Sequence, residues 1–322
     1  MKYFCTLFDS YYLNRGLVMY RSLLRVCSDY HLFIFAFDET SRVILEDMAL
    51  KNATIISLKE FENEELLKAK ADRSKSEYCW TCTPSVIEYC LNQYRILECT
   101  YIDADLYFFS DPTLLLDELK EDGVLITSHR YTKKYDKSAT SGTYCVQFIT
   151  FRNDTIGREV LTWWRDRCIE WCYARFENGK FGDQKYLDNW TQKFQGIREL
   201  VHEGGGVAPW NIQQYKVNEN KQTFFVTNKK SGYVFELIFY HFHAVKFLKG
   251  NLIDMGSYEL PGDSIQLYEI YIKEIALVDY DLIKLGFKKV VQPYKSKNYT
   301  PSFVHKLIRK FAGVYNVMKV NN

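Results

Sequence analysis

Strand-like and helix-like segments alternate through the first 105 residues of this chain, and this order constrains its fold more than any other feature. Apolar, aromatic and branched side chains fill the strand-like runs, whereas the helix-like segments repeat apolar residues every three or four positions. The predicted strands are residues 3–8, 30–37, 53–57 and 99–102, and the predicted helices are residues 13–26, 61–71 and 85–93. Such alternation is typical of βαβ units and predicts an α/β protein with a mostly parallel sheet.

Two acidic residues, Asp103 and Asp105, follow directly after the last of these strands. In an extended chain, side chains two positions apart point the same way, so both carboxylates can face one ligand. Two unpaired carboxylates are unfavourable inside a protein, and carboxylate oxygens suit a hard divalent cation such as Mg²⁺ or Mn²⁺. The pair therefore indicates either a metal site or a strand end at which two acids face only water.

Asp9 occupies a similar place, directly after the first predicted strand. Ligands of open α/β sheets bind beyond the carboxyl ends of the strands. We therefore expect Asp9 to lie at the same edge of the sheet as the acidic pair.

The composition is that of a globular protein, with 47% hydrophobic and 16% aromatic residues among 322, and the net charge of +2 gives no nucleic-acid signature. The charge is uneven, because no acidic residue follows Asp281. The basic residues beyond it are Lys284, Lys288, Lys289, Lys295, Lys297, Lys306, Arg309, Lys310 and Lys319. We expect one large domain over residues 1–255 and a basic helical appendage over residues 256–322.

The nine cysteines are scattered through predicted strands and helices. The pairs Cys79/Cys82 and Cys168/Cys172 have spacings that fit half a metal site, but no second matching pair accompanies either. We therefore expect buried, reduced thiols. The chain begins directly with a strand and has no apolar run near the roughly 20 residues that cross a bilayer, so we expect a cytosolic protein.

A second group of polar side chains follows an apolar strand predicted at residues 233–240. His241 and His243 are two positions apart, and Lys246 comes shortly after them. Imidazole can bind Mn²⁺, and an ammonium group can neutralise a phosphate. Either the histidines are structural, or they join the acidic pair around a cation that holds a diphosphate. The other elements predicted in this half are a strand at 144–151, helices at 156–176 and 183–190, and helix from residue 260 onward.

Four blocks along the chain resemble, in order, the GT-A type glycosyltransferases that use nucleotide-diphosphate sugars. The likeness is to the retaining galactosyltransferase-like group among bacterial polysaccharide and lipopolysaccharide enzymes. Residues 6–12 resemble the first-strand loop that holds the nucleotide base, and Asp103-Ala104-Asp105 resembles the DxD motif. Gly182-Asp183-Gln184 resembles the segment that lines the donor-sugar pocket. His243 with Lys246 is similar to the late histidine and lysine that bind metal and diphosphate.

This resemblance implies a GT-A fold, with a mixed sheet flanked by helices, and a metal-dependent transfer of sugar to a glycan or lipid-linked acceptor in cell-surface polysaccharide synthesis. It implies Mn²⁺ or Mg²⁺ as cofactor and a nucleotide-diphosphate sugar as donor. The implied base and donor contacts are Thr6, Phe8, Asp9, Tyr12, Asp103 and Lys246, the implied metal ligands are Asp103, Asp105 and His243, and the implied catalytic residues are Asp183 and Gln184.

The chain departs from the family pattern at two places. The late block of the family reads His-x-x-Gly-x-Lys-Pro, and this chain has neither the glycine nor the proline. Gln147 stands where many relatives carry an Asn-x-Gly donor contact, and it is either a substitute hydrogen-bonding group or a strand amide paired with backbone. Two other functions stay open on the same fold: a catalytically idle carbohydrate-binding protein, and a sugar nucleotidyltransferase. A nucleotidyltransferase is disfavoured, because this chain lacks the Gly-rich phosphate loop expected after the first strand.

Two further segments carry predictions about binding. Apolar and basic residues after residue 302 alternate as on an amphipathic helix, which fits either peripheral contact with an anionic membrane or a helix packed on the domain. The predicted apolar side is Phe303, Leu307, Phe311 and Val314, and the predicted basic side is Lys306, Arg309 and Lys310. Trp210 follows a glycine-rich loop, so we expect it to be exposed as a stacking platform for a sugar.

Overall fold

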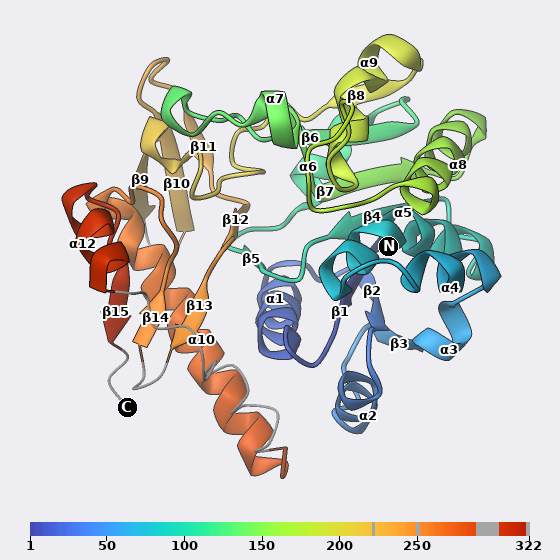
Figure 1. Cartoon of the computed structure of the whole chain (residues 1–322), viewed down its shortest axis with the longest axis horizontal. Helices are drawn as coiled ribbons and strands as arrows, with labels where there is room; N and C mark the ends of the chain where they lie inside the picture. The colour runs from blue at the N-terminus through green and yellow to red at the C-terminus, as the bar shows by residue number, and fades with distance from the viewer. Residues whose placement is uncertain (221–222, 249–251, 288–302, 320–322) are drawn as a thin grey trace.

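A seven-stranded mixed sheet forms the centre of the protein (Figure 1). The computed structural model describes residues 1–220, 223–248, 252–287 and 303–319. The strand order is β3-β2-β1-β4-β7-β6-β8. These strands are β1 (Lys2–Phe8), β2 (Tyr30–Ala36), β3 (Ala53–Ser57), β4 (Glu98–Ile102), β6 (Val124–Ser128), β7 (Tyr144–Arg152) and β8 (Ile197–Glu199). β1 is parallel to β2 and β4, whereas β7 is antiparallel to β4 and β6. The predicted mixed α/β sheet is confirmed.

Helices cover both faces of this sheet. They include α1 (Leu13–Val26), α2 (Glu39–Asp47), α4 (Glu64–Lys70), α5 (Lys75–Gln93), α8 (Thr155–Glu170) and α10 (Ile265–Lys284). Side chains of α1, α2 and α10 share one apolar core with Phe4 and Phe8, and those of α4, α5 and α8 share a second core with Cys5 and Leu7. Successive residues of β1 thus enter different cores, because side chains alternate between the two faces of a strand.

The remaining elements are short. The helices are α3 (Leu58–Phe61), α6 (Thr113–Leu116), α7 (Ser138–Ser141), α9 (Trp190–Lys193) and α12 (Phe303–Phe311), with 3-10 turns at 117–119, 133–135, 184–189, 212–214 and 262–264. β5 (Leu106–Phe108) pairs with β12 (Phe239–His241). Two three-stranded sheets are formed by β9 (Tyr215–Asn220), β10 (Thr223–Asn228) and β11 (Val234–Glu236), and by β13 (Lys246–Leu248), β14 (Leu252–Asp254) and β15 (Val317–Lys319).

Several predicted boundaries change. α5 begins ten residues earlier than predicted, because Ser74 and Glu77 form a capping box at its start and Pro84 is accommodated inside the helix. The helix predicted over 156–176 ends at Glu170, where the next residue takes an extended conformation. The helix predicted over 183–190 is a 3-10 turn, the strand predicted over 233–240 is divided into β11 and β12, and α2 was not predicted.

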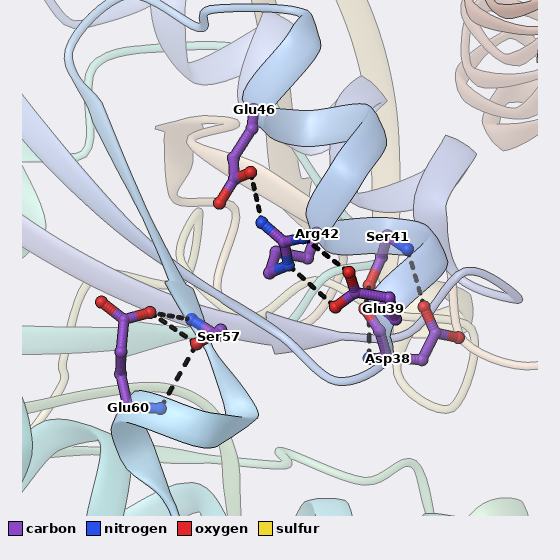
Figure 2. Close-up of polar contacts among 7 residues, drawn as sticks. All are labelled: Asp38, Glu39, Ser41, Arg42, Glu46, Ser57 and Glu60. Carbon is purple, nitrogen blue, oxygen red and sulfur yellow. Dashed lines mark hydrogen bonds and ion pairs between the residues drawn. The ribbon is translucent and has the colours of Figure 1, made fainter.

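Two helices begin close to the carboxyl ends of β2 and β3, and each starts with a capping box (Figure 2). Asp38 caps α2 by accepting a hydrogen bond from the Ser41 N–H at 2.7 Å, and Ser57 caps α3 in the same way with Glu60. These bonds satisfy backbone groups that helix starts leave open. On the side of α2 that faces the start of α3, Arg42 pairs with Glu39 and Glu46.

The C-terminal region packs against the first helix. α10 lies beside α1, and the ion pairs Arg21–Asp281 and Arg25–Glu274 join them at 2.7 Å each. β15 pairs with β14, so the end of the described chain returns to the strand that precedes residue 255. The division at residue 255 stays a prediction.

α12 differs from its predicted amphipathic pattern. Arg309 is buried, and its guanidinium lies 2.7 Å and 2.8 Å from the two carboxylate oxygens of Asp254. The predicted basic side therefore loses this residue to an internal ion pair, while Val314 is also buried. The side chain of Phe303 lies outside the described residues. The exposed apolar side chains of α12 are Val304, Leu307, Ile308 and Phe311. No helix in the described part of the chain is long and apolar enough to span a membrane.

We expect Arg309→Met to lower the free energy of unfolding by about 3–5 kcal/mol, because Asp254 would remain buried without its cation. Urea unfolding followed by circular dichroism measures this change. Replacing Asp254 by Asn in the same chain should recover part of the loss. Arg21→Met breaks a more exposed ion pair and serves as the matched control; an equal loss in both single variants would contradict the prediction.

Candidate functional site

The acidic pair lies in the turn between β4 and β5. The backbone N–H of Asp103 donates to the Gln147 carbonyl on β7 at 3.0 Å, and the Phe242 N–H donates to the Asp105 carbonyl at 3.0 Å. The antiparallel pairing of β5 with β12 sets His241 opposite Leu106. Three segments that are distant in sequence therefore meet at the two acids.

His241 is the imidazole that reaches the acidic pair. Its Nε2 lies 3.0 Å from Asp105 Oδ1 and 3.9 Å from Asp103 Oδ2. One possible ligand atom from each of the three residues lies within 4.8 Å of the others. Two carboxylates and one imidazole are donors that fit Mn²⁺ or Mg²⁺, so the residues present suit the cation that the DxD resemblance implies.

Electrostatics favour a cation at this group. Burial and the neighbouring Asp105 raise the pKa of Asp103. Burial also acts to raise the pKa of Asp105, but the adjacent His241 lowers it below its usual range. Burial alone would lower the pKa of His241, yet the charge and hydrogen bond of Asp105 raise it well above the usual value. The two carboxylates compete for one positive partner, and a divalent cation would satisfy both.

His243, the predicted third metal ligand, is not part of this group. Its side chain is exposed, and its ring lies 5.7 Å from the His241 ring and 5.5 Å from the Trp210 ring. Side chains two positions apart share one side of an extended chain, so strand alternation alone does not predict which of the two histidines lies nearer the acidic pair. The spacing to Lys246 could have done so. The family pattern His-x-x-Gly-x-Lys, read backwards from that lysine, ends on His241 and puts Ala244 at the glycine position.

Ala244 has a backbone conformation that glycine adopts more readily than other residues. Its φ is +66°, in the left-handed region that residues with a side chain seldom adopt. The turn leads into β13, whose first residue, Lys246, is exposed. The position of the absent glycine is thus occupied by an alanine in a conformation that usually favours glycine.

Arg15 holds this turn in place, although no sequence pattern identified it as a site residue. It is 3% exposed, and its Nη2 donates to the Val245 carbonyl at 3.0 Å. Its guanidinium lies 4.5 Å from the Tyr12 ring and 4.8 Å from the Phe247 ring. The first-strand loop is thereby joined to the segment that carries Lys246. An arginine on a helix gives no sequence signal for such a contact.

The residues predicted to contact the base divide into two kinds. Asp9 is partly exposed and accepts hydrogen bonds from the Tyr11 and Tyr12 N–H groups at 3.0 Å and 3.2 Å, and Tyr12 itself is exposed. The side chains of Thr6 and Phe8 are buried, at 0% and 2% exposed, because β1 lies between two helical layers. Neither side chain is exposed, and the assignment of Thr6 and Phe8 as base contacts stays a prediction.

Asp183 lies close enough to the acidic pair to be affected by its charge. It is buried, and burial together with the negative charge of Asp103 raises its pKa to about 7. Its carbonyl accepts a hydrogen bond from Trp164 Nε1 at 2.9 Å, which ties the segment to α8. Gln184 donates through Nε2 to the Ser141 carbonyl at 2.5 Å. The charge of the acidic pair thus acts on Asp183, while the side chain of Gln184 is bonded to α7.

Trp210 is not the exposed platform that we predicted. It is 4% exposed, and its Nε1 donates to the His129 carbonyl at 2.9 Å. Its ring packs edge-on against His241, with centroids 5.3 Å apart. The glycine-rich loop bends inward, so that Trp210 supports a site residue instead of facing solvent.

All nine cysteines are free thiols, and all except the partly exposed Cys79 are buried. Neither Cys79/Cys82 nor Cys168/Cys172 appears among the metal-ligand groups found in the described residues. A different group, Cys5, Cys90 and Cys99, brings three sulfur atoms within 4.8 Å inside the core. These three come from β1, α5 and β4, a meeting that spacing along the chain could not have indicated.

No known protein-family model matches the sequence. Among solved structures, the galactosyltransferase LgtC bound to donor and acceptor sugar analogues aligns with 85% of this chain and 95% of its own, at 11% identity and a TM-score of 0.53. That similarity confirms the predicted GT-A fold.

Two curated relatives come from Bacillus subtilis strain 168. The uncharacterised protein YfnF is 30% identical over 276 residues, which cover 83% of this chain and 89% of YfnF. The uncharacterised protein YfnD is 28% identical over 280 residues, covering 85% of this chain and 87% of YfnD. The chain, with its GT-A fold, therefore belongs to the same protein family as YfnF.

Proposed function

We propose that this protein is a metal-dependent glycosyltransferase that moves a sugar from a nucleotide-diphosphate donor to a glycan or lipid-linked acceptor, in the synthesis of a cell-surface polysaccharide. The observation that carries the proposal is the group Asp103, Asp105 and His241 at the end of β4 in a GT-A fold. The LgtC complex, which holds donor and acceptor sugar analogues on the same fold, supports this assignment.

In this proposal Asp103, Asp105 and His241 hold Mn²⁺ or Mg²⁺, with His241 in place of the predicted His243. A bound cation of this kind acts as a Lewis acid on the diphosphate and favours its departure. Lys246 adds a positive charge for the same diphosphate. Asp9 and Tyr12 are the side chains of the first-strand loop that can face the base.

Asp183 and Gln184 are proposed to face the transferred sugar. The raised pKa of Asp183 and its place near Asp103 are what a group beside a charged reaction centre would have. The likeness to retaining enzymes favours retention of configuration at the sugar. With either stereochemical outcome, Asp183 would act as a base or as an electrostatic stabiliser, and Gln184 as a polar neighbour of the anomeric carbon.

The first test is release of nucleoside diphosphate from a panel of nucleotide sugars, with Mn²⁺ and with a chelator. We expect metal-dependent release from one donor and a loss of at least about 100-fold in Asp105→Asn, since one buried charge next to a reacting group typically has this effect. Asp47→Asn, which changes an exposed acid on α2, is the matched control. Nucleoside-diphosphate release at the same rate with and without chelator would contradict the proposal. Equal rates in Asp105→Asn and Asp47→Asn would contradict it as well.

A second prediction concerns the role of Asp183. We expect Asp183→Asn to lower the rate of transfer by roughly 100-fold or more, while donor affinity stays close to that of the unchanged protein. Calorimetry of donor binding and single-turnover transfer separate the two quantities. Equal losses in binding and in transfer would show that Asp183 holds the donor instead of assisting the reaction.

The proposed lipid-linked acceptor would place the enzyme at a membrane, and the exposed side of α12 suits that contact. Ile308 and Phe311 are 62% and 90% exposed, and Lys310 lies beside them. Apolar side chains next to a basic residue fit an anionic lipid surface. The cytosolic location expected from the sequence stays a prediction.

Flotation of the full chain with vesicles of phosphatidylglycerol and phosphatidylcholine tests this contact. We expect the bound fraction to fall several-fold in the double variant Ile308→Glu/Phe311→Glu, because charged side chains resist burial in the lipid interface. Phe176→Glu, at an apolar residue that is 51% exposed elsewhere, is the control. Unchanged flotation of the double variant would remove α12 as the contact.

A further inference from the structure

Gln147 is bonded to two of the three residues in the proposed metal group. It lies on β7, and its side chain is fully buried. Its backbone carbonyl accepts the Asp103 N–H at 3.0 Å, and its side-chain Oε1 lies 2.6 Å from His241 Nδ1. The side chain is therefore paired with an imidazole, and not with the backbone as the second sequence interpretation had it.

The chemistry of an amide oxygen determines which ring nitrogen of His241 faces the acidic pair. A carbonyl oxygen only accepts hydrogen bonds, so Nδ1 must carry the proton that it donates to Gln147. The other ring nitrogen, Nε2, points to Asp105 at 3.0 Å. An imidazole with its proton on Nδ1 can offer the lone pair of Nε2 to a cation, and metal-binding histidines are commonly oriented by such a second bond.

The surroundings of Gln147 fit an amide held in one orientation. Its Nε2 is buried and has no hydrogen-bond partner among the described residues. A Cβ atom built on Gly206 would lie only 3.3 Å from that nitrogen, so the glycine leaves the space that the amide needs. Reversing the amide would turn an N–H group toward Nδ1 and require Nε2 to carry the ring proton. An unpaired buried N–H is unfavourable, and its presence here indicates that the oxygen is needed at His241.

We propose that Gln147 is a positioning residue that holds His241 as the Nε2 ligand of the divalent cation. This inference rests on the proposed function, because it assumes a cation at Asp103, Asp105 and His241. Trp210 restrains the same ring from another side, with centroids 5.3 Å apart and planes at 80°. The strand β7 thereby sets both the backbone of the DxD turn and the orientation of its histidine.

The test is Mn²⁺ affinity of the full chain without donor, measured by electron paramagnetic resonance. We expect Gln147→Met to weaken Mn²⁺ binding by about 10–100-fold, the range typical for loss of a group that orients a metal ligand. Gln147→Glu keeps an accepting oxygen and should bind Mn²⁺ more tightly than Gln147→Met. Adding Gln147→Met to His241→Ala should give no further loss, because the amide acts only through that ring.

Thr150→Val is the matched control, since it removes another buried hydrogen bond of β7, the 2.8 Å bond between Thr150 and Thr100. It should leave Mn²⁺ affinity unchanged, and thermal unfolding in chelator reports the folding of every variant. Equal Mn²⁺ affinity in Gln147→Met and the unchanged protein would overturn the inference and leave the proposed function intact. If the unchanged protein bound no Mn²⁺, the proposed metal site and the inference would fall together.

Discussion

The short antiparallel pairing of β5 with β12 is the contact on which the rest of the site depends. It joins segments more than 130 positions apart through the pairs Leu106–His241, Tyr107–Tyr240 and Phe108–Phe239. Because side chains alternate along a strand, Tyr240 points toward Tyr268 of α10 while His241 points toward the acidic pair. A slip of one residue would exchange these two directions. The buried aromatic side chains of β12 therefore set the register that completes the site.

Three acids and one imidazole lie close together at the site. Asp103 and Asp105 compete for His241, and the buried Asp183 adds a third acid nearby. Burial of several carboxylates with one imidazole is unfavourable unless a cation accompanies them. Arg15 contributes positive charge from one side, but its hydrogen bonds go to carbonyl groups. The arrangement is thus more easily understood as a ligand site than as a structural ion-pair network.

The sequence allowed the fold class and the DxD turn to be predicted, because buried parallel strands are read from continuous apolar runs and their carboxyl ends are known ligand positions. Other features depend on tertiary contacts that no local pattern reveals. Thr6 was expected to face the nucleotide base and Trp210 to be exposed, yet both side chains are buried. Arg309 fitted a basic helical face, but a partner 55 residues away draws it inside. Strand alternation treats His241 and His243 alike, and the structure shows that His241 is the one that approaches the acidic pair.

Ala244 lies in a strained turn between two residues of the proposed site, His241 and Lys246. The chain must turn sharply after β12 if His241 is to face the acids while Lys246, five residues later, begins β13. An L-residue with φ of +66° is unfavourable by about 1 kcal/mol or more, and such a conformation persists only when its surroundings enforce it. Arg15 supplies that enforcement at the Val245 carbonyl, and the β5–β12 pairing supplies it at His241. Since the turn is held at both ends, an alanine can keep a left-handed conformation that would otherwise favour glycine.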